Sequence, residues 1–360
     1  MASKPPPRPV AEFAVATTDW SRTIVDDNFY RVPGGCGWMR FGQCASLTRN
    51  RFIMGDLATV NNWIGVRPQR GTEVIAPPVV FMQRFMESRA TRLVEQAVAT
   101  GQFVVNDVDD WFWGLHPENQ AYKASHPDLN PISNIDHYRN TLAASSLVTV
   151  STPFLAEQIS EWGVSTRIVE NRVSAWRFSM RRHLPGKPIV GWAGSTGHRS
   201  GDLAILKRPF KSLKSHVRFH HTGHIESNPL FADEVGLSRS DVSLMQMLPP
   251  LDYPNGLVFD IGVIPLTDNS FNEAKSFCKG LEYAAAGIPF VASPSREYRR
   301  LYEQHGVGRL AATPTEWVDH IKELMDPEVR SAEAERQRAI VESDFNVKGM
   351  AREWDSIVLP

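Results

Sequence analysis

The sequence predicts an α/β fold built on parallel sheets, and three observations support this prediction. Segments with the character of β-strands alternate with helical segments along the chain, as they do in βαβ units. Residues 257–266 form an apolar run interrupted only by Asp260 and Gly262, which is typical of a parallel strand covered on both faces. The length of 360 residues is sufficient for two domains that each bury a core of their own.

The first half of the chain is expected to contain strands at residues 12–17, 74–82, 102–106, 145–151 and 167–170. A helix is expected at residues 84–99. Another begins after Thr152, whose hydroxyl can cap it, with Pro153 in the first helical position. A glycine-rich loop at residues 30–37 precedes a further predicted helix at 39–47.

The second half opens with a predicted strand at residues 188–193, a glycine-rich turn at 194–201 and a helix from about Asp202. Glycine lets backbone N–H groups approach an anion, so such a turn between a strand and a helix can cradle a phosphate. The spacing of these glycines matches neither G-x-G-x-x-G nor the phosphate loop that ends in lysine. A plain connection between strand and helix therefore explains the turn as well.

A second helix with functional character is predicted further along the chain. Ser270 and Glu273 form an S-x-x-E capping box, which predicts a helix start near Phe271. Gly287 ends this helix, and a strand follows at residues 290–293.

One face of this predicted helix carries Lys275, Lys279 and Glu282, at positions i, i+4 and i+7. Two lysines at this spacing repel each other by roughly 0.2–0.5 kcal/mol, and a bound anion would remove the repulsion. The pattern therefore indicates either an anion site or a solvated face on which Lys279 pairs with Glu282. The opposite face is apolar and is expected to face the core, with Phe277, Leu281 and Ala284.

The composition is typical of a soluble globular protein, with 22% charged and 42% hydrophobic residues. The net charge of −1 argues against strong non-specific binding to nucleic acid. Seven arginines, no lysine and three acidic residues lie between Arg22 and Arg70. This segment could face an acceptor that bears phosphate, or it could be ordinary surface.

The three cysteines, Cys36, Cys44 and Cys278, include no C-x-x-C pair and indicate neither a disulfide framework nor a zinc site. We therefore expect a reduced protein in the cytoplasm. The proline-rich residues 1–10 lack the apolar segment of a signal peptide and are expected to form a disordered tail. No run of about 18 apolar residues predicts a membrane span.

Three motifs between residues 259 and 293 carry a resemblance to a known family: FDIG-x-x-PL, D-N-x-FN-x-x-KS and K-x-x-EYAAAGIP-x-VAS. Their order resembles the carboxy-terminal half of GT-B glycosyltransferases, in particular the retaining, family-four-like "glycosyltransferase group 1" enzymes of bacterial or phage type. The resemblance implies two Rossmann-like parallel-sheet domains that face each other across a cleft.

The domain boundaries implied by this resemblance follow the composition of the chain. Residues 11–175 would form an acceptor-side domain, and residues 176–187 a linker. Residues 188–345 would form the domain that binds the nucleotide-sugar. Residues 346–360 would form a C-terminal helix that could pack back on the N-terminal domain.

The resemblance also implies roles in donor binding. Glu282 corresponds to the second glutamate of the family's E-x7-E element, which binds the ribose. The first glutamate would fall at Ala274, and Glu273 is one residue out of step, so its role is not transferred. Ser276, beside Lys275, is expected to contact the phosphates or the sugar instead.

Gly194 and Ser195 correspond to the diphosphate-binding loop of the family. Ser195 stands at the position of the family's arginine, and Arg199 is the nearest basic substitute. Together with Lys275 and Lys279, Arg199 is expected to stabilise the charge that develops on the leaving diphosphate.

Two features of the first half fit the same family. The glycine-rich loop at residues 30–37 resembles its flexible first loop, which approaches the donor sugar and the acceptor. Residues 104–113 resemble a V-x-D-x-DD-x-W element of bacterial and phage relatives. The carboxylates of Asp107, Asp109 and Asp110 could bind a metal, face the acceptor, support the structure or act in catalysis. Because GT-B enzymes generally act without metal, we expect no metal and retain Asp110 as a catalytic candidate.

These expectations describe an enzyme that moves a sugar from a nucleotide-diphospho-sugar to an acceptor, with retention of configuration and with no cofactor. The acceptor could be a glycan, a lipid-linked sugar, a protein or a modified DNA base. A GT-B nucleotide-sugar epimerase, which needs no separate acceptor, is one alternative. A catalytically inactive GT-B binding module is another, because the first glutamate of the E-x7-E element is missing.

Overall fold

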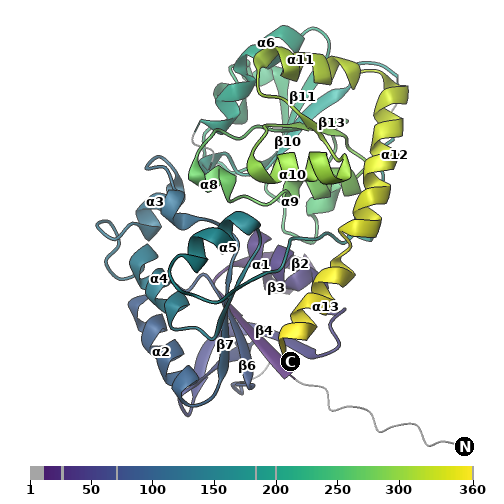
Figure 1. Ribbon diagram of the computed structural model, residues 1–360. Coiled ribbons are helices and arrows are strands. Elements are labelled where there is room, and N and C mark those ends of the chain that lie inside the picture. Colours follow the sequence, from purple (N-terminus) through teal and green to yellow (C-terminus); the bar gives the residue numbers. More distant parts are fainter. Residues whose placement is uncertain (1–11, 26–27, 70–71, 183–184, 199–200, 359–360) are drawn as a thin grey trace, which may run out of the picture.

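The computed structural model describes residues 12–25, 28–69, 72–182, 185–198 and 201–358. Two α/β units lie one above the other, and helices α12 (Pro327–Asp344) and α13 (Val347–Val358) run along one side of both (Figure 1). We call the part around the first sheet the amino-terminal unit and the part around the second sheet the carboxy-terminal unit. None of the described helices is both long enough and apolar enough to span a membrane.

Within the described residues, the amino-terminal unit contains a seven-stranded sheet with the order β5-β4-β1-β6-β7-β8-β9. Its strands are β1 (Glu12–Thr17), β4 (Arg51–Val60), β5 (Trp63–Pro68), β6 (Val79–Gln83), β7 (Phe103–Val108), β8 (Leu147–Val150) and β9 (Thr166–Ile168). The strand predicted at residues 12–17 is confirmed with the same bounds. The strand predicted at 74–82 is shorter, because Ile75 forms only an isolated bridge with Val66 and β6 begins at Val79.

Helices connect these parallel strands, as the alternating sequence pattern predicts. They are α2 (Ser88–Ala99), α3 (Gln120–Ser125), α4 (Ile135–Ala143) and α5 (Pro153–Ser160). The predicted cap of α5 is confirmed, since the hydroxyl of Thr152 accepts a hydrogen bond from the backbone N–H of Leu155 at 3.3 Å.

Two antiparallel hairpins were not predicted. Strands β2 (Trp20–Val25) and β3 (Asn28–Pro33) form one, and β4 and β5 form the other. Asn61 and Asn62 connect β4 to β5 with φ angles of 50° and 67°, and type I′ hairpin turns require positive φ at both central residues. The helix predicted at residues 39–47 is also wrong in its bounds, because α1 covers Gly35–Arg40 and a single 3₁₀ turn covers Gly42–Cys44.

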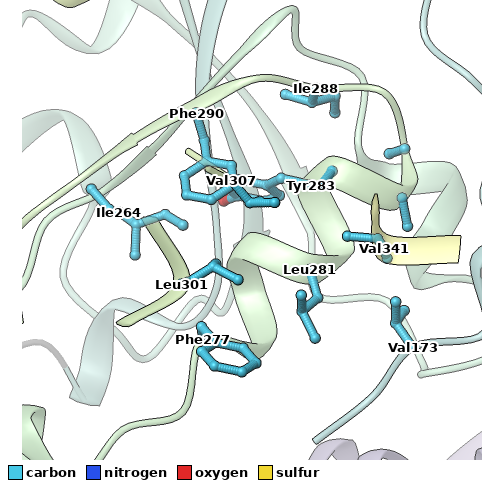
Figure 2. Close-up of a cluster of buried hydrophobic side chains, with 14 of the residues drawn as sticks. Val173, Ile264, Phe277, Leu281, Tyr283, Ile288, Phe290, Leu301, Val307 and Val341 are labelled. Atoms are coloured by element: carbon cyan, nitrogen blue, oxygen red, sulfur yellow. The ribbon is translucent and has the colours of Figure 1, made fainter. Parts of the chain in front are cut away.

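The carboxy-terminal unit contains a six-stranded parallel sheet in its described part, with the order β12-β11-β10-β13-β14-β15. Its strands are β10 (Ile189–Ala193), β11 (Arg218–His224), β12 (Val242–Gln246), β13 (Ile261–Ile264), β14 (Phe290–Ala292) and β15 (Arg309–Leu310). Its further helices are α6 (Lys207–Leu213), α7 (Phe231–Glu234), α8 (Ser270–Glu273), α9 (Cys278–Ala285), α10 (Arg296–His305) and α11 (Pro314–Glu323). Figure 2 shows the core beside α9, where Leu281 and Tyr283 meet Phe290 and Leu301.

The single helix predicted from Phe271 is wrong, because the chain forms α8 and α9 with a break between them. The predicted capping box is wrong as well. Asn269 is the cap of α8, and its side chain accepts a hydrogen bond from the N–H of Asn272 at 2.9 Å. The carbonyl of Ala274, just after α8, accepts a hydrogen bond from the Thr152 hydroxyl of the amino-terminal unit at 3.1 Å. Contact with the other unit therefore accompanies the break.

The chain passes between the two units at two neighbouring points. Val173 donates a backbone hydrogen bond to Phe345 at 2.9 Å and accepts one from Val347 at 3.3 Å. Beyond this point α13 packs on the amino-terminal unit, where Trp354 shares a core cluster with Phe13. The last helix of the described chain thus covers the first sheet.

The fully buried guanidinium of Arg40 joins several of these parts. Its Nε and Nη2 donate to the two carboxylate oxygens of Asp107 on β7, at 3.0 and 2.8 Å. Its Nη1 donates to the carbonyl of Val169 and, at 2.9 Å, to Oδ1 of Asn171. The indole N–H of Trp354 donates to the carbonyl of Arg40 at 3.0 Å. Arg40 therefore connects α1, β7 and the segment after β9 through its side chain, and α13 through its backbone carbonyl.

Replacing Arg40 with Met should lower the free energy of unfolding by about 3–5 kcal/mol, because the buried carboxylate of Asp107 would lose its cation. Denaturant unfolding measures this loss. The matched control is Arg51→Met, whose exposed ion pair with Glu12 should contribute less than about 1 kcal/mol. Equal small losses in both variants would contradict the role of Arg40.

Candidate functional site

A cavity of about 490 Å³ lies between the two units, at the carboxyl ends of strands from both sheets. Open α/β sheets bind ligands at these ends. The cavity is lined from the amino-terminal unit by Gly35, Cys36, Arg84, Asp109, Asp110 and Asn171. It is lined from the carboxy-terminal unit by Ser195, Lys275, Ser276, Lys279 and Glu282. The candidate side chains therefore meet here, namely those of Asp109, Asp110, Ser195, Lys275, Ser276, Lys279 and Glu282. Arg199 lies outside the described residues.

The loop after β10 approaches this cavity in a conformation that requires glycine. Gly194 has a φ of 148°, and a Cβ atom there would lie 3.1 Å from the ring of Trp192 and 3.4 Å from Nζ of Lys279. Gly223, with a φ of 111°, would place a Cβ atom 2.6 Å from the carbonyl oxygen of Gly194. The side chain of Ser195 accepts a hydrogen bond from Nδ2 of Asn228 at 2.8 Å. These contacts fix the loop against β11.

Lys279 and Glu282 lie on α9 at the wall of the cavity. The ammonium of Lys279 donates a hydrogen bond to the carbonyl of Ala193, at the carboxyl end of β10. Burial raises the pKa of Glu282, and the positive charge of Lys279 opposes that shift. The lysine thus lies between the loop at Gly194 and the carboxylate.

Lys275 and Ser276 lie in the break between α8 and α9 and contact the opposite unit. Nζ of Lys275 is 3.5 Å from Oδ1 of Asp110, and Oγ of Ser276 accepts a hydrogen bond from Nδ2 of Asn171 at 2.7 Å. The side chain of Lys275 is 19% exposed. Lys275 therefore lies mostly covered between the two units, beside Asp110.

The three aspartates that follow one another on β7 and after it have different surroundings. Asp107 is fully buried with Arg40 and is part of the structure beneath the cavity. Asp109 and Asp110 both line the cavity and both bind Arg84, which the sequence analysis missed. Burial raises the pKa of Asp109, while Arg84 opposes the shift.

Arg84 has an unusual backbone conformation for a long side chain. It follows β6 with a φ of 62°, in the left-handed region, which costs a residue other than glycine about 1–3 kcal/mol. Its Nη2 atom contacts Asp109, Asp110 and the thiol of Cys36, each at 2.9 Å. These three side chains also have ligand atoms within 4.8 Å of one another, as a metal site requires. A guanidinium already supplies the cation in this cluster.

Glu273 does not face the main cavity. Its carboxylate accepts a hydrogen bond from the backbone N–H of Arg296, at the start of α10, at 3.2 Å. Ala274, at the position of the family's first glutamate, is fully buried. Neither residue therefore places a carboxylate beside Glu282.

A second cavity of about 390 Å³ adjoins the first and shares Lys279 and Glu282 with it. Aromatic residues line it, and the guanidinium of Arg177 lies 4.6 Å from the ring centroid of Trp38. Burial raises the pKa of Tyr253 well above its ordinary value, and the charge of Glu282 adds to the shift. This cavity could not be predicted from the sequence, because its residues come from five separate segments of the chain.

His221, on β11, contacts the loop that follows β10. Its ring stacks between Trp192 and Phe231, with centroid distances of 5.2 and 5.1 Å. Its Nε2 atom lies 2.9 Å from the carbonyl oxygen of Gly194. Burial lowers the pKa of His221 to about 4, so the ring is neutral at pH 7 and its Nε2–H can donate to that carbonyl.

Comparisons with known proteins identify the fold. No family model matches the sequence, and no curated protein matches it either. Sucrose-phosphate synthase from Thermosynechococcus elongatus is similar in structure, with a TM-score of 0.64, 12% identity, and coverage of 96% of this chain and 98% of that chain. HepE from Anabaena in complex with UDP-glucose has a TM-score of 0.64, 14% identity, and coverage of 96% and 99%. TarM from S. aureus, in complex with UDP and alpha-GlcNAc-glycerol among other ligands, has a TM-score of 0.57, 11% identity, and coverage of 94% and 62%.

These structures share the GT-B fold, and this chain has it too. The predicted fold class, two parallel-sheet domains, is therefore confirmed.

The neutral His221 should make the protein sensitive to acid. The unfolded chain binds a proton near the ordinary histidine pKa of 6.5, whereas the folded chain binds it near 4. The stabilising contribution is therefore complete above pH 6.5 and is lost as the pH falls toward 4, by about 3 kcal/mol. His221→Phe keeps the stacking and should lose less stability over this range in denaturant unfolding. The control is His216→Phe, at an exposed position. The same pH slope in His221→Phe and in the wild type would contradict this assignment.

Proposed function

We propose that this chain is a glycosyltransferase that moves a sugar from a nucleotide-diphospho-sugar to an acceptor, with retention of configuration and without a metal ion. One observation carries the proposal. Cations and carboxylates from both units, with Lys275, Lys279 and Glu282 facing Asp110, surround one cavity at the carboxyl ends of the strands. Two of the similar structures, both of HepE, are complexes with UDP and with UDP-glucose.

The two adjoining cavities suit the parts of a nucleotide-sugar. Glu282 lines both cavities, so a ribose bound by its carboxylate would have the base in one cavity and the diphosphate with its sugar in the other. We place the base in the second cavity beside Tyr253. We place the diphosphate near Gly194, Ser195 and Lys279, and the sugar in the larger cavity. The cavity volumes fall within the usual range of ligand sites, about 300–1,000 Å³.

The chemistry requires one bond to break and one to form at the anomeric carbon. The bond from this carbon to the diphosphate oxygen breaks through an oxocarbenium-like state, and the acceptor oxygen bonds to the same carbon while its hydroxyl proton passes to the leaving diphosphate. Lys275 and Lys279 would stabilise the charge on the leaving diphosphate, with Ser276 beside them. Asp110 would face the acceptor hydroxyl from the opposite unit. Arg199 remains a candidate for a further cation that stabilises the charge on the leaving diphosphate.

Retention rests on the family resemblance of the motifs between residues 259 and 293. The absence of a metal requirement is supported by Arg84, whose guanidinium binds the two carboxylates that a metal would otherwise bridge. A cytoplasmic location fits the three free thiols. The acceptor could be a glycan, a lipid-linked sugar, a protein or a modified DNA base.

Turnover separates this proposal from its alternatives. Candidate donors are UDP-, GDP- and ADP-sugars, tested with extracts of the native host as the source of acceptor. A transferase releases free nucleoside diphosphate and labels an acceptor with the sugar. An epimerase would convert the donor without an acceptor, and an inactive binding module would do neither.

Nucleoside diphosphates should raise the melting temperature, because a ligand at 100 times its Kd stabilises the native state by about 2.7 kcal/mol. Glu282→Ala should remove most of the shift produced by UDP, GDP or ADP. The matched control is Glu273→Ala, whose carboxylate faces away from the cavity and should leave the shift unchanged. A full shift in Glu282→Ala would place the nucleotide elsewhere.

Lys275→Ala and Lys279→Ala should remain folded, and at least one of them should turn over roughly a hundred times more slowly. A preorganised group that stabilises developing charge contributes about 2.7–4 kcal/mol to the barrier. Initial rates of nucleoside diphosphate release measure this, with the exposed Lys214→Ala as control. Near-normal rates in both variants would remove the two lysines from the mechanism and leave Arg199 as the leading candidate.

Turnover should continue in excess EDTA. The expectation follows from the contact of Arg84 with both Asp109 and Asp110, which leaves their charge compensated by an arginine. Loss of the activity in EDTA, with recovery on adding manganese or magnesium, would assign these aspartates to a metal-bound diphosphate.

A further inference from the structure

Arg84 is held in a conformation that a long side chain rarely adopts. Its φ of 62° lies in the left-handed region, directly after the carboxyl end of β6. Such a residue persists only where the surrounding contacts determine its position, and such positions concentrate at functional sites. The contacts of Arg84 therefore indicate what this backbone conformation achieves.

The guanidinium of Arg84 is fixed by the carboxylate of Asp109 and in turn binds the carboxylate of Asp110. Its Nε and Nη2 atoms bind the two oxygens of Asp109 at 3.1 and 2.9 Å, in a bidentate pair that sets the plane of the group. Asp109 itself is only 7% exposed, so this pair has little freedom. From the same Nη2 atom the guanidinium reaches Oδ2 of Asp110 at 2.9 Å. The position of Asp110 is thus set through Arg84.

The second oxygen of Asp110 faces the other unit. Its Oδ1 lies 3.5 Å from Nζ of Lys275, in the break between α8 and α9. Asp110 is therefore shared between a cation of its own unit and a cation across the cavity. Arg84 and Lys275 contact it as cations, and the carboxylate of Asp109 and the neutral thiol of Cys36 each have a ligand atom within 4.8 Å of it.

We propose that Arg84 is a positioning residue that holds Asp110 at a fixed place across the cavity from Lys275. This inference rests on the proposed function. Without Arg84, repulsion from Asp109 would move Asp110 closer to Lys275 than the present 3.5 Å, and the tighter ion pair would hold the lysine back from the leaving diphosphate. Arg84 thus keeps both groups available, Asp110 for the acceptor and Lys275 for the donor.

The test is a double-variant cycle on nucleoside diphosphate release. Arg84→Ala should lower kcat by about 100-fold, the scale on which misplacing a catalytic group acts, and change the donor KM by less than about threefold. Arg84→Lys should recover part of the loss, because it restores the charge without the bidentate geometry. The double variant Arg84→Ala/Asp110→Asn should be no slower than Asp110→Asn alone, because Arg84 acts through Asp110. Arg89→Ala, on the exposed face of α2, is the control and should be unchanged.

Independent losses that multiply in the double variant, or a change confined to KM, would overturn the proposal. A crystal structure of Arg84→Ala gives a readout without turnover, in which Asp110 should have moved toward Lys275. An unmoved carboxylate would also overturn it. If the wild type released no nucleoside diphosphate from any donor, the proposed function would fail, and this crystal structure would still decide the role of Arg84.

Discussion

The buried ion pair of Arg40 and Asp107 is the interaction on which the candidate site depends. Removing two charges from water is costly, and the cost is offset only where further hydrogen bonds complete the geometry. Here Asp107 also accepts a hydrogen bond from Thr149 at 2.8 Å, and Arg40 donates to the segment after β9. The pair therefore sets the distance between α1, which begins in the glycine-rich loop, and the end of β7. Asp109 and Asp110 follow directly from that end.

The same pair reaches the carboxy-terminal unit through one amide. Asn171 accepts a hydrogen bond from Arg40 and donates one to Ser276, in the break between α8 and α9. Nearby, Arg300 of α10 binds Glu170 at 2.7 Å. A hydrogen-bonded path thus runs from the Arg40–Asp107 ion pair through Asn171 to Ser276, which follows Lys275 in the sequence. The groups on the two sides of the cavity are positioned relative to each other by this path.

The sequence predicted the parts of the fold that depend on local pattern. Strand β1 and the cap at Thr152 follow from apolar periodicity and from hydrogen bonds close in sequence. The apolar run at residues 257–266 likewise predicts a buried strand, which the structure forms over the shorter range Ile261–Ile264. The break after α8 could not be predicted in this way, because Thr152, which binds the carbonyl of Ala274, is 122 residues away. The turn at Asn61 and Asn62 does carry a local signal, because asparagine tolerates positive φ.

The residues of the candidate site also divide into those that local sequence predicts and those that only the fold brings together. Lys279 and Glu282 were found because they share a helix and a motif. Arg84 could not be found in this way, because nothing near it in sequence indicates that its backbone enters the left-handed region or that its side chain meets Asp109 and Asp110, 25 and 26 residues later. Tyr253 and Arg177 were missed for a related reason, since they line one cavity only after distant segments have come together. The functional role of a residue could be predicted where the residue belongs to a sequence motif. It could not be predicted where contacts between distant segments create the role.

The packing of α13 against the first sheet has a consequence for how the protein is made. The core that contains Phe13 and Phe81 also contains Met350 and Trp354, so the amino-terminal unit is not a continuous piece of chain. A ribosome that adds 5–20 residues per second needs roughly ten to forty seconds to pass from the end of β9 to α13. During that time the apolar side of the first sheet has no α13 to cover it. The nascent first unit should therefore bind chaperones during synthesis. The second unit, whose sheet is continuous in sequence, can complete its core before the first unit does.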